Sequence, residues 1–110
     1  MEDTKFELIM CIVNAGFSQN VMAAARKAGA RGGTILRGRG SANPESEEFF
    51  NITIQPDKEI LLILTSAHTK DTILKAIYKD GGLTTEASGI AFSLPVERTT
   101  FTMSKELEEE

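Results

Sequence analysis

The sequence has one cysteine, Cys11, one histidine, His68, and no tryptophan. A single cysteine cannot close an internal disulfide, and one cysteine with one histidine cannot build a zinc cluster. Long apolar runs are also missing. The run from Leu8 to Val13 is too short to span a bilayer, and acidic residues precede it instead of the basic start of a signal peptide. We therefore expect a cytoplasmic protein with no metal site and no direct insertion into a membrane.

Positive charge is scarce and unevenly placed. The 110 residues carry a net charge of −4, which argues against a general nucleic-acid binder because such proteins carry a basic excess. Acidic residues gather at Glu45–Glu48 and in the tail, but the stretch from Arg26 to Arg39 has five basic residues and no acidic one. A chain of this length forms a single domain, over residues 1–110, and association with further copies would extend its small core.

In the first half of the chain, hydrophobic periodicity predicts two strands with a helix between them. Residues 6–13 form an apolar run rich in strand formers, and Thr34–Leu36 forms a second strand between glycines. Between these strands, Ser18 caps a helix that reaches Ala28, and Gly29 ends it. The inward face of this helix carries Val21, Met22, Ala25 and Ala28.

The second half repeats this order after an exposed loop at Ser41–Glu48. An alternating segment and an apolar run form one long strand, bent or broken near Pro56, and a helix follows that starts at Thr69 or Asp71. The long strand comprises Phe49–Ile54 and Ile60–Leu64. The helix turns Ile73, Ile77 and Tyr78 inward and ends at Gly81-Gly82. A fourth strand follows at Ile90–Val96, and a short edge strand at Thr99–Met103.

The resulting order is β-α-β-β-α-β, which predicts an α+β protein of the ferredoxin-like class. In this fold two helices cover one face of a four-stranded antiparallel sheet. The other face of the sheet is then bare. In a chain this small, a bare apolar face favours oligomerisation through the sheet.

The segment GARGGTILRGRG, from Gly29 to Gly40, holds five of the nine glycines. It lacks the Gly-Lys-Ser/Thr ending of a P-loop, and no helix follows it as a dinucleotide fingerprint would require. Its glycines expose backbone N–H groups, and Arg37 and Arg39 supply bidentate donors for phosphate or carboxylate. The pattern therefore leaves two interpretations open: an anion site, or a flexible turn with solvated arginines.

No other segment carries a sign of catalysis. The loop GGLTTEASG, from Gly81 to Gly89, either lines a ligand or simply links a helix to a strand. We expect His68 to be an exposed residue before the second helix, Cys11 to be a buried strand thiol, and the acids at 45–48 to be solvated. No nucleophile–base pair is visible, so the chain is predicted to be a binding protein without catalytic residues.

Taken together, several segments resemble the PII signal-transduction proteins, which include nitrogen-regulatory PII and PII-like proteins. The resemblance covers residues 6–103 and rests on the element order, on GARGGT, on FFNITIQPDKEILLIL and on GLTTEASGIAFSLPVER. It implies a homotrimer whose sheets face the three-fold axis and which binds ATP or ADP in clefts between subunits. It also implies a T-loop at about residues 40–51 that docks on a protein partner, and an acidic tail at about residues 104–110.

The resemblance assigns a ligand role to residues in four short segments. Gly32, Gly33 and Thr34 match the turn that meets adenine and ribose, and the backbone of Ile63, Leu64 and Thr65 matches the segment facing the base. Gly38, Arg39 and Gly40 match the base of the T-loop near the phosphates, and Ser88 and Gly89 match a loop that also cradles phosphate. With Arg37 and Arg98 as further cations, these residues form the predicted nucleotide site.

The sequence departs from the family pattern at three positions. Ile90 stands where the family has a lysine, and Phe101 and Met103 stand where it has a pair of arginines. Those cations normally hold the polyphosphate. Arg37, Arg39 and Arg98 would compensate from other directions, so ADP and AMP join ATP as expected ligands. The only tyrosine, Tyr78, lies in the second helix and not in the T-loop.

The sequence therefore predicts a PII-like regulator that binds an adenine nucleotide, with or without Mg²⁺, and has no prosthetic group. Its partner would be a membrane transporter or a metabolic enzyme. A second hypothesis is a trimeric adaptor whose ligand site has decayed or takes another small molecule, as Ile90, Phe101 and Met103 suggest. A third is a small enzyme that uses His68 or Cys11.

Overall fold

The computed structural model describes residues 5–41, 57–83 and 89–102. Its elements are β1 (Phe6–Asn14), α1 (Ser18–Lys27), β2 (Thr34–Arg39), β3 (Asp57–Ser66), α3 (Lys70–Asp80), β4 (Ile90–Val96) and the short 3-10 helix η1 (Thr100–Thr102). No helix in these ranges is long and apolar enough to span a membrane.

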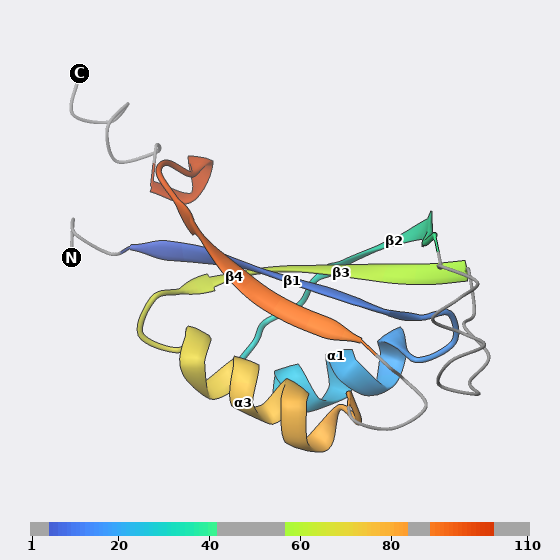
Figure 1. Cartoon of the computed structure of the whole chain (residues 1–110). Coiled ribbons are helices and arrows are strands. Elements are labelled where there is room, and N and C mark those ends of the chain that lie inside the picture. Colours follow the sequence, from blue (N-terminus) through green and yellow to red (C-terminus); the bar gives the residue numbers. More distant parts are fainter. Residues whose placement is uncertain (1–4, 42–56, 84–88, 103–110) are drawn as a thin grey trace.

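The strands form one antiparallel sheet in the order β2-β3-β1-β4, with β2 and β4 at its two edges. Both helices lie on the same face of the sheet (Figure 1). This element order and strand order are those of the ferredoxin-like fold, so the predicted fold class is confirmed.

The core lies between the sheet and the two helices. Side chains alternate along a strand, so every second residue of β1 and β3 points at the helices and is buried. Each large apolar side chain buried in this way contributes about 1.5–3 kcal/mol to folding. The core residues are Ile9, Cys11 and Val13 of β1, Leu61 and Ile63 of β3, Val21, Met22 and Ala25 of α1, and Ile73 and Ile77 of α3.

Cys11 is fully buried in this core, as its apolar surroundings in the sequence predict. Burial raises the pKa of the Cys11 thiol to about 11. The thiol is therefore protonated at neutral pH, and since the thiolate is the reactive form, Cys11 is a packing residue and a poor nucleophile.

The opposite face of the sheet is apolar, and neither α1 nor α3 covers it (Figure 1). Residues directly opposite each other in an antiparallel pair lie on the same face, and the register gives the members of this face. They are Leu8, Met10 and Ile12 of β1, Leu36 of β2, Ile60, Leu62 and Leu64 of β3, and Ile90, Phe92 and Leu94 of β4. We call these residues the open face. Its most exposed side chains are Ile90 at 59%, and Leu36 and Leu94 at 45% each.

Two predictions about local structure are wrong. Tyr78 does not face inward but is 59% exposed, because Ile73 and Ile77 already fill the inward positions of α3. The segment from Thr99 does not form an edge strand. The backbone N–H of Phe101 donates to Thr99 Oγ1 at 3.2 Å, and this local hydrogen bond accompanies a 3-10 turn at Thr100–Thr102 in place of a strand.

Other boundaries shift or stay untested. β2 continues past Leu36 to Arg39, because its residues stay in register with β3 as far as Asp57. Gly38 therefore does not interrupt the strand. The predicted strand at Phe49–Ile54 and the bend near Pro56 lie outside the described residues, as do most of residues 40–51, Ser88, Met103 and the acidic tail.

Candidate functional site

The predicted nucleotide residues fall into two groups at opposite edges of the sheet. Residues 32–40 lie on or next to β2, and Gly89 precedes β4. Neighbouring strands are about 4.8 Å apart, so three steps across the sheet separate the two edges by about 14 Å. One subunit alone therefore does not bring Gly40 and Gly89 onto the same phosphate.

Near the start of β2, the chain packs closely against β3. A Cβ atom on Gly33 would lie 2.8 Å from the backbone oxygen of Leu62, so this close approach requires glycine. β2 begins at Thr34, opposite Leu62, and among the described strands none pairs with Ile63–Thr65 on that side. This leaves the backbone of that segment at the edge where the predicted base-binding residues meet.

The side chains of this β3 segment point elsewhere. Ile63 is fully buried in the core, Leu64 belongs to the open face, and the Thr65 hydroxyl lies 2.7 Å from that of Thr69. The contacts predicted for this segment therefore involve its backbone atoms and not its side chains. His68 is exposed just before α3, as predicted.

At the other end of β2, the two candidate arginines lie in a regular strand and not in a flexible turn. Arg37 is directly opposite Glu59 in β3, and Arg39 is directly opposite Asp57. Opposite charges in such positions attract each other. The interpretation of this segment as a flexible turn is therefore wrong, although both arginine side chains are exposed to solvent, as that interpretation expected.

Glu59 also caps helix α1, a role predicted for Ser18. Phe17 is the N-cap residue, and it makes no side-chain capping hydrogen bond. Instead, the backbone N–H groups of Gly16 and Ser18 donate to Glu59 Oε1 at 3.0 and 3.1 Å. A carboxylate in this position satisfies helix donors that have no partner inside the helix.

These contacts lower the pKa of Glu59. The Ser18 hydroxyl has the largest effect, and the backbone N–H groups of Gly16 and Ser18 and the charge of Arg37 act in the same direction, against a smaller cost of desolvation. Because the pKa is lower in the folded than in the unfolded chain, the stabilisation is present above the ordinary value of 4.5. It is lost as the pH falls through the lowered pKa of the folded state.

Glu59→Gln is expected to lower the free energy of unfolding at pH 7 by about 1 kcal/mol, the usual size of an N-cap interaction. It should also flatten the loss of stability on acidification, because glutamine does not titrate. Urea unfolding between pH 3 and pH 7 measures both effects. Glu97→Gln, which changes an exposed residue after β4, is the matched control. Identical pH profiles for Glu59→Gln and the unchanged chain would contradict the capping role.

Lys58 is a cation that the sequence reasoning missed. Its Nζ donates to Asn14 Oδ1 at 2.6 Å, and a Cβ atom on Gly40 would lie 3.0 Å from Lys58 Cε. Lys58 is directly opposite Gly38, at the end of the sheet where residues 40–51 begin. The alternation DKEILLIL could have revealed it, because Lys58 shares the parity of Ile60 and Leu62 and so ends an otherwise apolar face.

On the β4 edge, Gly89 is packed tightly against β1. A Cβ atom on Gly89 would lie 2.4 Å from the backbone oxygen of Ile12. Gly89 is at the same end of the sheet as Gly40, because Ile90 and Ile60 both pair with Ile12. Arg98 follows the opposite end of β4, about 20 Å away along the strand. The structure therefore does not bring Arg98 to Gly89 within one chain.

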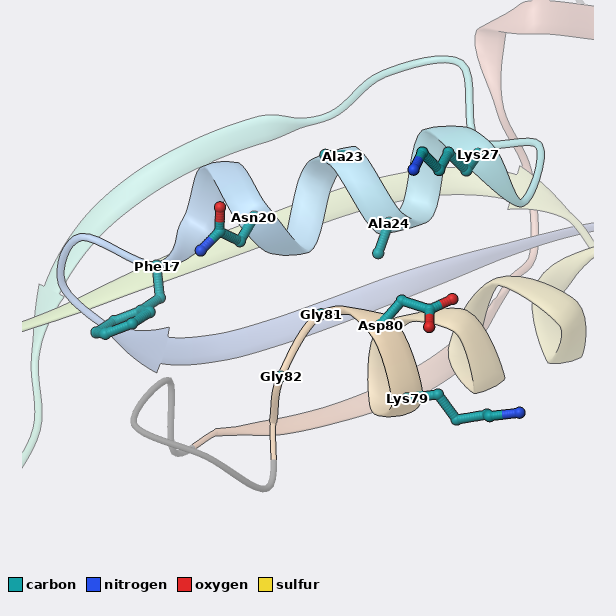
Figure 2. Close-up of a pocket in the computed structure, with 9 residues that line it drawn as sticks. All are labelled: Phe17, Asn20, Ala23, Ala24, Lys27, Lys79, Asp80, Gly81 and Gly82. Carbon is teal, nitrogen blue, oxygen red and sulfur yellow. The ribbon is translucent and has the colours of Figure 1, made fainter.

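A separate groove of about 740 Å³ lies between the two helices (Figure 2). It contains none of the predicted nucleotide residues, and it lies on the helical side of the sheet, away from the open face. One wall consists of Phe17, which precedes α1, and of Asn20, Ala23, Ala24 and Lys27 in α1. The other wall consists of Lys79 and Asp80 at the end of α3 and of Gly81 and Gly82, which follow it. Within the described ranges, no group of three His, Cys, Asp or Glu residues is placed to hold a metal ion.

These features define a ferredoxin-like domain with an apolar open face and with candidate ligand residues divided between two sheet edges. The comparisons with known proteins show which solved structures this domain resembles. The chain matches the crystal structure of Arabidopsis thaliana PII bound to citrate with a TM-score of 0.63 and 27% identity, over 87% of this chain and 79% of that one. The resemblance seen in the sequence is thereby confirmed, and the match supports membership of the PII family.

A second match shows the same fold at greater distance. It is a PII-like signalling protein from Thermus thermophilus, with a TM-score of 0.60 and 17% identity, over 84% of this chain and 86% of that one. No protein-family model and no curated protein matches the chain.

Proposed function

We propose that the chain is a PII-like regulator that forms a homotrimer, binds an adenine nucleotide between subunits and controls a protein partner through residues 40–51. The likeness to PII signalling proteins supports this function and a role in binding instead of catalysis. A membrane transporter or a metabolic enzyme in the cytoplasm would be the regulated partner.

The observation that carries the proposal is the division of the candidate residues between the edges of the sheet. Arg39 and Gly40 on one edge and Gly89 on the other lie at the same end of the sheet, on edge strands about 14 Å apart. If the open faces of three subunits pack together, the β2 edge of one subunit meets the β4 edge of the next. That contact would complete a site that one chain leaves in two halves.

A ligand bound at this site would contact the residues that lead directly into residues 40–51. Arg39 and Gly40 lead directly into this segment, and β3 resumes on its other side at Asp57. A ligand that contacts Arg39 and Gly40 better in one conformation of the segment shifts the population toward that conformation. Differential binding of this kind is what a regulator requires.

Arg39→Ala is expected to weaken nucleotide binding by about 1.5–3 kcal/mol, the usual contribution of a charge-assisted hydrogen bond. Isothermal titration calorimetry with ATP, ADP and AMP measures the change. Arg26→Ala, which removes an exposed arginine from the last turn of α1, is the matched control and should leave affinity unchanged. If both variants bind like the unchanged chain, Arg39 is not part of the site.

A second candidate function is a trimeric adaptor whose site takes a different small molecule. Ile90 lies on the apolar open face and Phe101 packs on Phe6 with ring centroids 6.0 Å apart, so neither position offers a cation for a polyphosphate. The matching Arabidopsis thaliana PII structure holds citrate. Citrate and 2-oxoglutarate therefore belong in a thermal-shift panel beside ATP, ADP, AMP and cyclic di-AMP, each with and without Mg²⁺.

That panel decides between the two candidates. A ligand at 100 times its Kd stabilises the folded state by about 2.7 kcal/mol, which moves the melting temperature visibly. A shift with an adenine nucleotide supports the regulator. A shift with citrate alone, or no shift with a trimer confirmed by light scattering, supports the adaptor.

A further inference from the structure

The candidate phosphate end of the site has little net positive charge. Among the described residues of β2 and β3, the cations at this end are Arg37, Arg39 and Lys58, and the carboxylates are Asp57 and Glu59. Each arginine is directly opposite one of the carboxylates. The three cations and two carboxylates together give a net charge of +1 in each subunit.

The helix N-terminus nearest to this end, that of α1, is already occupied by a carboxylate. The N-terminus of a helix is a common phosphate-binding element, because its N–H groups lack partners inside the helix. At the start of α1, the N–H group of Ser18 and that of Gly16, two residues earlier, already donate to the Glu59 carboxylate. A phosphate would have to displace this carboxylate to use them.

The neighbouring segments of the sequence add no cation. Residues 42–56 and 84–88 together contain four glutamates and no lysine or arginine. Gly89 is followed by Ile90, an apolar residue of the open face. The two segments of the sequence that follow Ser41 and precede Gly89 therefore carry acidic side chains and no basic ones.

We propose that Asp57 and Glu59 are specificity-determining residues that make this site prefer a nucleoside monophosphate to a triphosphate. This inference rests on the proposed nucleotide-binding function. Each further phosphate in a nucleotide adds negative charge next to the two carboxylates, where the described side chains at the ends of β2 and β3 carry a net charge of only +1. The order of affinity is therefore AMP, then ADP, then ATP.

Calorimetric titration of the 110-residue chain with AMP, ADP and ATP tests the order. AMP should bind at least about tenfold more tightly than ATP in the absence of Mg²⁺. Adding Mg²⁺ should narrow the gap, because the metal neutralises part of the triphosphate charge. Asp57→Asn should raise the affinity for ATP relative to AMP by roughly threefold to tenfold, as expected for removing one nearby charge at a solvated site.

Asp80→Asn is the matched control, because it removes the same charge from an exposed residue at the end of α3. It should leave the ratio of the AMP and ATP affinities unchanged. ATP binding as tightly as AMP, or an equal response of this ratio to Asp57→Asn and Asp80→Asn, would overturn the specificity proposal while leaving nucleotide binding intact. Absence of binding by all three nucleotides would overturn the proposed function itself.

Discussion

Gly89→Ala is expected to lower the free energy of unfolding by about 2–3 kcal/mol, near the upper end of the range for overpacked positions. The added methyl group would lie 2.4 Å from the backbone oxygen of Ile12 and 2.6 Å from Val13 Cγ1. Ile12 is in the central strand β1, so its backbone cannot move without disturbing the pairs with β3 and β4. A shift of β4 away from β1 removes the steric clash at the lowest energetic cost, but it weakens the hydrogen bonds at the edge of the sheet.

Gly32→Ala is the matched control for this substitution. No atom lies within 4 Å of a Cβ atom built on Gly32, and its φ is not in the left-handed region. Alanine there should be neutral or should stabilise the fold by about 0.4–1 kcal/mol through a less flexible unfolded chain. Urea unfolding of the two variants measures the difference. Equal free energies of unfolding for the two variants would mean that β4 accommodates the methyl group without destabilising the fold.

The comparison also separates two reasons for a glycine at a predicted ligand position. Gly32 and Gly89 both match the family pattern for nucleotide contacts, but only Gly89 is required by packing within one subunit. A loss of ligand affinity in Gly32→Ala, with unchanged stability, would indicate that the glycine allows close approach of a ligand. The same loss in Gly89→Ala would not, because the fold itself is perturbed.

The fold could be predicted largely from the sequence because its strongest signals are periodic. Alternating or continuous apolar residues mark β1 and β4, and a stripe of small and apolar residues marks α1, so these elements lie within one or two residues of their predicted bounds. The weak signals failed. Tyr78 lies next to the inward stripe of α3, and the hydroxyl-rich residues after β4 form a local turn instead of a strand.

The charge of the candidate site could not be predicted, because it depends on strand register. Between Arg26 and Arg39 the sequence has no acid, so Arg37 and Arg39 look like unpaired cations. The register of β2 with β3 places two carboxylates opposite them, from residues about twenty positions later in the sequence. Ser18 likewise has the composition of an N-cap, but the cap comes from Glu59, 41 residues away. Pairs between residues this far apart in the sequence cannot be recognised from the local sequence pattern.

Leu94→Glu is expected to convert the proposed trimer into a folded monomer. Leu94 lies on the open face, opposite Leu8, and is 45% exposed in the isolated chain. A glutamate at this position stays hydrated in a monomer, so the fold of one subunit should be kept. In a trimer whose open faces pack together, the same carboxylate would be buried without a partner, which costs several kcal/mol in each subunit.

Tyr78→Glu gives the matched control, because Tyr78 is 59% exposed but lies on α3, on the other side of the sheet. It should stay trimeric in sedimentation velocity experiments, while Leu94→Glu sediments as a monomer with an unchanged circular dichroism spectrum. If Leu94→Glu also stays trimeric, the open face is not the subunit interface. The two sheet edges then have no reason to meet, and the proposal of a site shared between subunits fails with it. If Leu94→Glu is monomeric and has also lost nucleotide binding, the result ties assembly to the completion of the site, because Leu94 itself is near none of the candidate residues at the Gly89 end of β4.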